Sequence, residues 1–155
     1  MSSRHPRTMG LDVGERRIGM AIADELGMIA SPIGVVQRGE GDMQRILETA
    51  LTQNAGVIVI GLPTGLSGRE GPQAATVRAF AEKLAKESHD SLEIVFWDER
   101  LTSAMAERAL DVQGRKKNRR TGEIDAIAAA LILQGYLDAE RNSFRQRRPL
   151  ERDAR

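Results

Sequence analysis

The chain has 155 residues, a net charge of +1 and 41% hydrophobic residues, which fits one folded domain with a buried core rather than a disordered chain. It has no cysteine, which excludes disulfides, thiol catalysis and cysteine-based zinc sites, and its two histidines have no partner at ligand spacing. The longest apolar run, Ile127 to Leu133, is too short to span a bilayer, and no signal peptide is apparent, so we expect a cytoplasmic protein.

The first third of the chain predicts an antiparallel meander of three strands. Residues 1–7 have the composition of a disordered leader, a strand begins at Thr8, and residues 17–23 alternate as a second strand. A turn at residues 24–27 leads to a third strand over 28–36. Pro32 cannot donate a hydrogen bond, which places the third strand at an edge of the sheet.

The remainder alternates helices with strands. Asp42 is expected to cap the first helix, and Pro72 lies near the first turn of the second. Continuous apolar runs over 57–60 and 94–97 are typical of strands buried on both faces. The predicted helices cover residues 42–51, 72–85, 102–110 and 123–140.

These elements predict an α/β fold: a mixed five-stranded sheet, with the antiparallel meander followed by parallel strands and with helices on both faces. We expect a single domain over residues 8–140, followed by a basic, flexible tail over 141–155. No repeat and no domain boundary is visible.

Three acidic residues stand where folding alone would not place them. Asp12 interrupts the first strand, Glu99 follows the strand over 94–97, and Asp125 lies within a helix that is apolar all round. Each has a plain structural alternative: Asp12 capping a turn, Glu99 in a solvated loop, and Asp125 complementing the helix dipole. Together, buried carboxylates require a cation. Oxygen-only ligands favour Mg²⁺ or Mn²⁺, and such sites support phosphodiester hydrolysis.

Two basic segments contrast with an otherwise acidic chain. One precedes Asp125 by only a few residues, and the other is the arginine-rich tail. This segregation indicates a polyanionic partner, although the tail is equally consistent with a solvated segment that maintains solubility. The first segment consists of Arg115, Lys116, Lys117, Arg119 and Arg120.

Five segments of the sequence resemble one known family, YqgF/RuvX. The segments occur in the family's order and together span about residues 8–138. They are Gly10-Leu11-Asp12-Val13-Gly14 with Arg17-Ile18-Gly19, then Val59-Ile60-Gly61-Leu62-Pro63, then Gly68 to Ala74, then Asp98 to Ser103, and finally Ile124 to Ala129 continuing through Leu133 to Leu137.

The resemblance implies an RNase-H-like fold and a metal-dependent nuclease, with Asp12, Glu99 and Asp125 as catalytic metal ligands. Family members are described as pre-16S rRNA nucleases and as Holliday junction resolvases. The implied partner is therefore structured RNA or branched DNA. The basic segment over 115–120 lies five residues before Asp125, so we expect it to bind phosphates beside the site. The sequence leaves the oligomeric state open between a monomer and a homodimer. The stretch over 64–67 departs from the family pattern, which leaves the role of the glycine-rich loop over 61–71 open.

Two other classes of protein compete with a nuclease. Actin-like ATPases and sugar kinases also open with a strand carrying an Asp-x-Gly motif, as at Asp12 to Gly14, but they need two such domains and 155 residues leave no room for them. A non-catalytic nucleic-acid-binding module would tolerate the loss of a carboxylate, whereas all three are present here.

Overall fold

The sheet has five strands in the order β3-β2-β1-β4-β5. The computed structural model describes residues 6–63, 70–98 and 121–153. Strand β1 is antiparallel to β2, which is antiparallel to β3, whereas β4 and β5 run parallel to β1. This confirms the predicted mixed sheet. The elements are β1 (Arg7–Val13), β2 (Arg17–Ala23), β3 (Ala30–Gln37), α1 (Asp42–Thr52), β4 (Ala55–Leu62), α2 (Pro72–Glu87), β5 (Glu93–Asp98) and α4 (Thr121–Asp153).

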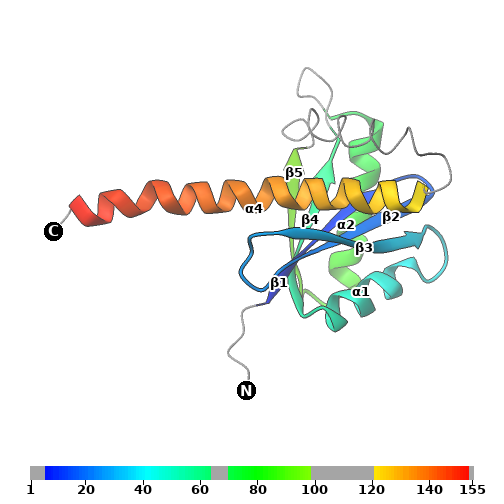
Figure 1. The fold of residues 1–155 in the computed structure, drawn as a ribbon. Coiled ribbons are helices and arrows are strands. Elements are labelled where there is room, and N and C mark those ends of the chain that lie inside the picture. The colour runs from blue at the N-terminus through cyan, green and yellow to red at the C-terminus, as the bar shows by residue number, and fades with distance from the viewer. Residues whose placement is uncertain (1–5, 64–69, 99–120, 154–155) are drawn as a thin grey trace.

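Helices cover both faces of the sheet, as predicted. Because side chains alternate along a strand, Leu11 and Ile60 face the larger core formed with α1 and α2. Val59 and Ala21 face the opposite side, where they pack against Leu133 and its neighbours on α4. Figure 1 shows α4 lying across this second face, with its C-terminal part projecting beyond the sheet.

Helix α4 approaches the sheet closely because the strand residues beneath it are small. A Cβ atom added to Gly10 would lie 2.8 Å from the Cβ of Leu133, and Ala21 and Ala23 are almost fully buried under the same helix. A side chain at position 10 would overlap with α4, so the glycine sets the distance between helix and sheet.

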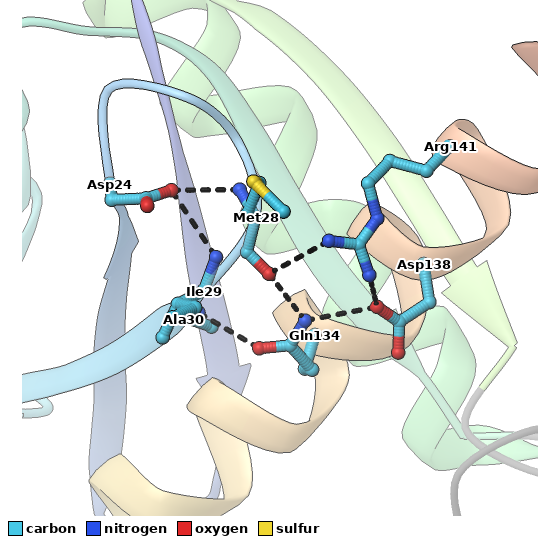
Figure 2. A network of polar contacts seen from close by, with 7 residues as sticks. All are labelled: Asp24, Met28, Ile29, Ala30, Gln134, Asp138 and Arg141. Carbon is cyan, nitrogen blue, oxygen red and sulfur yellow. Dashed lines mark hydrogen bonds and ion pairs between the residues drawn. The ribbon is translucent and has the colours of Figure 1, made fainter.

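The hairpin that joins β2 to β3 is fastened to α4 by polar contacts (Figure 2). Gln134 donates to the carbonyl of Met28 (2.8 Å) and accepts from the N–H of Ala30 (2.9 Å). Arg141 also donates to the Met28 carbonyl (3.4 Å) and pairs with Asp138. Helix α4 continues to Asp153, past the end at Glu140 that the sequence pattern predicts, and the Arg141 contacts fasten the first residue beyond that point.

The edge position of β3 agrees with the sequence, whereas the start of α1 differs from the prediction by one residue. Strand β3 is an edge strand, as Pro32 indicates. The N-cap of α1 is Gly41 rather than Asp42, because Gly41 adopts a positive φ of 84° and Asp42 becomes the first helical residue. The predicted helix over 102–110 and the loop over 64–69 lie outside the described residues. In the part of the chain that the structure describes, no helix combines the length and apolar character needed to cross a membrane.

Candidate active site

The carboxyl ends of three parallel strands meet at one edge of the sheet. Strands β1, β4 and β5 share a direction, so the ends at Val13, Leu62 and Asp98 lie along this edge. Asp12 is the penultimate residue of β1. In open α/β sheets, ligands bind outside this edge, because loops rather than strands occupy it.

Asp12 and Asp125 come together on the α4 side of this edge. Asp12 alternates with Leu11 and Val13, which belong to the opposite core, and it pairs across the ladder with Gly19. A Cβ atom on Gly19 would lie 1.9 Å from the carbonyl oxygen of Asp125. The backbone of Asp125 is therefore in contact with the residue directly opposite Asp12.

The side chain of Asp125 is held by Arg17. The Arg17 Nε donates to the Asp125 Oδ2 at 2.6 Å, and the two side chains are 32% and 26% exposed, respectively. Arg17 and Asp125 are 108 positions apart in the sequence, so this ion pair links strand β2 to helix α4. The family resemblance includes Arg17, but the sequence alone assigns no role to it.

The end of β5 is packed firmly beside the same face. Trp97 and Tyr136 of α4 meet edge to face, with ring centroids 6.2 Å apart. Burial raises the pKa of Tyr136, so it remains a neutral packing residue at physiological pH. Strand β5 lies two strand spacings, roughly 10 Å, from β1.

Two sets of predicted site residues fall outside the described part of the chain. Glu99 follows Asp98 directly, and the basic residues from Arg115 to Arg120 precede α4. Within residues 6–63, 70–98 and 121–153, no group of three or more acidic or histidine side chains is close enough to hold a metal. The structure thus brings the backbones of Asp12 and Asp125 close to one another through Gly19, and the ligand role of all three acids stays a prediction.

The donors at this edge fit a hard divalent cation. Asp12 and Asp125 offer only carboxylate oxygens, and glycine separates them where a larger residue would fill the space. Mg²⁺ typically binds one or two protein carboxylates and completes its shell with water and substrate phosphate. Two carboxylates at an open edge of the sheet meet that requirement.

A cavity of about 200 Å³ adjoins Asp12 on the α2 side of the edge. Gly14, Pro63 and Gln73 contribute to its walls, together with Arg38. The Arg38 guanidinium lies 5.2 Å from the centre of the Phe80 ring and donates to the Gly14 carbonyl at 3.0 Å. The candidate site therefore has room for a small group beside Asp12, on the side of the edge opposite Asp125.

Solved structures of nucleases share this fold. Thermus thermophilus RuvC, in complex with a Holliday junction substrate, matches with a TM-score of 0.53 and 14% identity, over 88% of this chain and 96% of that chain. The yeast mitochondrial Holliday junction resolvase matches with a TM-score of 0.50 and 14% identity, over 91% of this chain and 84% of that one. The fold is therefore RNase-H-like, as the resemblance implies.

Sequence comparison narrows this class to one family. The model of the RuvX family, described as Holliday junction resolvase, matches residues 6–139. A protein of Symbiobacterium thermophilum is 46% identical over 137 residues, which cover 86% of this chain and 92% of that protein. One from a Nocardioides species is 45% identical over 138 residues, covering 86% and 88%. Both carry the name "Putative pre-16S rRNA nuclease".

The chain belongs to the RuvX family. This is a family of nucleases, hydrolases that act on phosphodiester bonds. The match confirms the resemblance found in the sequence.

Proposed function

We propose that this chain is a metal-dependent nuclease that processes the 5′ end of pre-16S rRNA in the cytoplasm. Its metal ligands are Asp12, Glu99 and Asp125, and its cofactor is Mg²⁺ or Mn²⁺. The observation that supports this most strongly is the meeting of Asp12 and Asp125 across Gly19 at the carboxyl edge of the parallel strands.

The protein's own residues supply binding and orientation. Asp12, on a central strand, and Asp125, on a helix packed against that strand, would hold the cation together with Glu99, which follows β5 in the sequence. A divalent cation bound there would polarise the scissile phosphate and activate water. The cavity beside Asp12 lies on the α2 side of the same edge, where it can accept a part of the substrate that extends past the metal centre. The basic segment over 115–120 contacts flanking phosphates.

RNA is the preferred substrate because the relatives that share 41–46% identity with this chain are named for pre-16S rRNA. Branched DNA is the second candidate, because the matching family model is described as a Holliday junction resolvase. Resolution of junctions and trimming of an rRNA precursor use the same hydrolytic chemistry. The two functions therefore differ in the substrate that is bound and not in the carboxylates that the reaction needs.

A cleavage assay with paired substrates tests the proposal. An RNA spanning the 5′ end of 16S rRNA and its precursor sequence, and a four-way DNA junction, are each incubated with Mg²⁺ and the wild-type protein or Asp125→Asn. We expect cleavage of the RNA and a loss of several orders of magnitude in the variant, since a metal ligand is removed. Glu140→Gln, an exposed acid on the same helix, serves as control. Equal cleavage by wild type and Asp125→Asn contradicts the proposal.

A further inference from the structure

We propose that Arg17 is a positioning residue for the metal ligand Asp125. By holding one carboxylate oxygen, Arg17 sets the orientation in which the other oxygen meets the cation. The inference rests on the metal centre proposed above. The contact behind it is the bond from the Arg17 Nε to the Asp125 Oδ2 at 2.6 Å, between residues on β2 and α4.

The backbones of both residues that form this bond are held in place. The Arg17 carbonyl accepts from the Gly14 N–H at 2.9 Å, which closes the connection from β1 to β2. The backbone of Asp125 is in contact with Gly19. The remaining freedom of the Asp125 carboxylate is therefore rotation about its side-chain bonds, and the bond from Arg17 restricts that rotation.

If the Arg17 guanidinium had a different role, charge neutralisation, the opposite effect on metal affinity would be expected. If Arg17 only neutralised the carboxylates, it would compete with the cation, and removing its charge would strengthen metal binding. If it orients Asp125, removing it weakens binding despite the loss of a positive charge. Among the described residues, the Arg17 contact with Asp125 involves one nitrogen and one oxygen, which leaves Oδ1 available to a ligand. Partners of this kind typically change metal affinity 10- to 100-fold.

Mn²⁺ titration by calorimetry of the metal-free protein tests the inference without relying on activity. We expect Arg17→Gln and Arg17→Lys to weaken Mn²⁺ binding about 10- to 100-fold. Lysine keeps the charge but cannot reproduce the planar donor of arginine. Arg16→Gln is the matched control, because Arg16 is exposed, carries the same charge and provides its carbonyl to the Arg38 N–H at 2.8 Å. It should bind Mn²⁺ within about twofold of wild type, as an exposed, screened charge has little effect.

The outcomes separate this inference from the proposed function. Unchanged or tighter Mn²⁺ binding in Arg17→Gln, or wild-type binding in Arg17→Lys, overturns the role of Arg17. Wild-type Mn²⁺ binding that does not respond to Asp12→Asn overturns the metal centre itself, and the inference with it. Thermal unfolding of each metal-free variant shows whether it is folded. If Arg17→Gln does not fold, the Mn²⁺ affinity of Arg17→Lys decides the question.

Discussion

Gly19 is the residue on which the geometry of the site depends most. It pairs with Asp12 on one strand and touches the backbone of Asp125 on the helix, so it holds two predicted ligands at a fixed separation. No side chain fits between β2 and α4 there. The site therefore depends on the absence of a side chain at position 19 as much as on the two carboxylates.

Replacing Gly19 with alanine should destabilise the fold and the site together. The new Cβ meets backbone atoms rather than the end of a flexible side chain, so α4 must shift. We expect a loss of about 1–3 kcal/mol or more in the free energy of unfolding, measured by chemical denaturation, and weaker Mn²⁺ binding. Gly71→Ala, where no atom lies within 4 Å, should change stability by less than about 1 kcal/mol. Equal effects of the two substitutions would be inconsistent with this packing.

Residue-scale reasoning from the sequence identifies acids more readily than their partners. Asp12 and Asp125 stand out because a charge interrupts an apolar strand or helix. The bond from Arg17 to Asp125 could not be predicted, since it joins positions 108 apart and depends on the register of α4 against β2. An arginine at the start of a strand ordinarily indicates a solvated end.

At the scale of elements, the alternation of small residues along β2 anticipates its packing. Gly19, Ala21 and Ala23 occupy every second position and all face α4. Strand alternation alone predicts β2, but the small size of these residues also indicates that a helix approaches closely. The prediction that Asp42 caps α1 is wrong. Helix N-caps generally favour a residue with a side-chain oxygen, such as aspartate. Here the N-cap is Gly41, one residue earlier, because glycine readily adopts the positive φ that the backbone has there.

The docking of the β2–β3 hairpin on α4 should depend on Gln134. The hydrogen bonds of its side-chain amide to Met28 and Ala30 link the hairpin to the helix, and a third, to Asp138 one turn further along α4, orients the amide (Figure 2). We expect Gln134→Ala to cost about 1–3 kcal/mol of stability and to speed hydrogen exchange at the Ala30 amide, because that donor loses its acceptor. Asn142→Ala, exposed on the same helix, is the control. Unaltered exchange at Ala30 in Gln134→Ala would rule out this docking role.

The same hairpin should loosen in acid. The Asp24 Oδ1 accepts from the N–H groups of Met28 (2.7 Å) and Ile29 (3.2 Å), and these bonds hold the pKa of Asp24 below its ordinary value of 3.8. A lowered pKa means that the stabilisation is fully present above the ordinary value and is lost as the pH falls through the folded-state pKa. Hydrogen exchange at Met28 and Ile29, corrected for intrinsic rates, should rise over that window in wild type. The same pH response in Asp24→Asn would contradict this assignment.

At the scale of the whole molecule, charge is segregated along the chain. The basic residues 115–120 immediately precede the helix that carries Asp125, and α4 itself continues into the arginine-rich segment beyond residue 140. Strand alternation and helical periodicity are local, so they predict the five strands and the helices α1, α2 and α4, although α4 extends past its predicted end at residue 140. The placement of the basic segment relative to the site depends on chain outside the described residues, and it stays a prediction.

Neutralising the basic segment should weaken nucleic-acid binding without regard to sequence. We expect a variant with Lys116, Lys117, Arg119 and Arg120 all replaced by glutamine to bind RNA more weakly. Its dependence of log affinity on log salt should become shallower by roughly 0.7–0.9 for each phosphate that the variant no longer neutralises. Mn²⁺ affinity should be retained, because no metal ligand is altered. An unchanged salt slope, measured by fluorescence anisotropy, would remove this segment from the binding surface and favour the arginine-rich tail.

The shared carboxylate centre is tested most directly by anomalous diffraction from crystals soaked in Mn²⁺. We expect a manganese peak at the carboxyl edge of β1, β4 and β5, with carboxylate oxygens of Asp12, Glu99 and Asp125 as its ligands. A peak bound by Asp12 and Asp125 while Glu99 points away would contradict the three-ligand centre. No peak at this edge, in crystals where Mn²⁺ binds elsewhere, would contradict the metal-dependent nuclease as a whole.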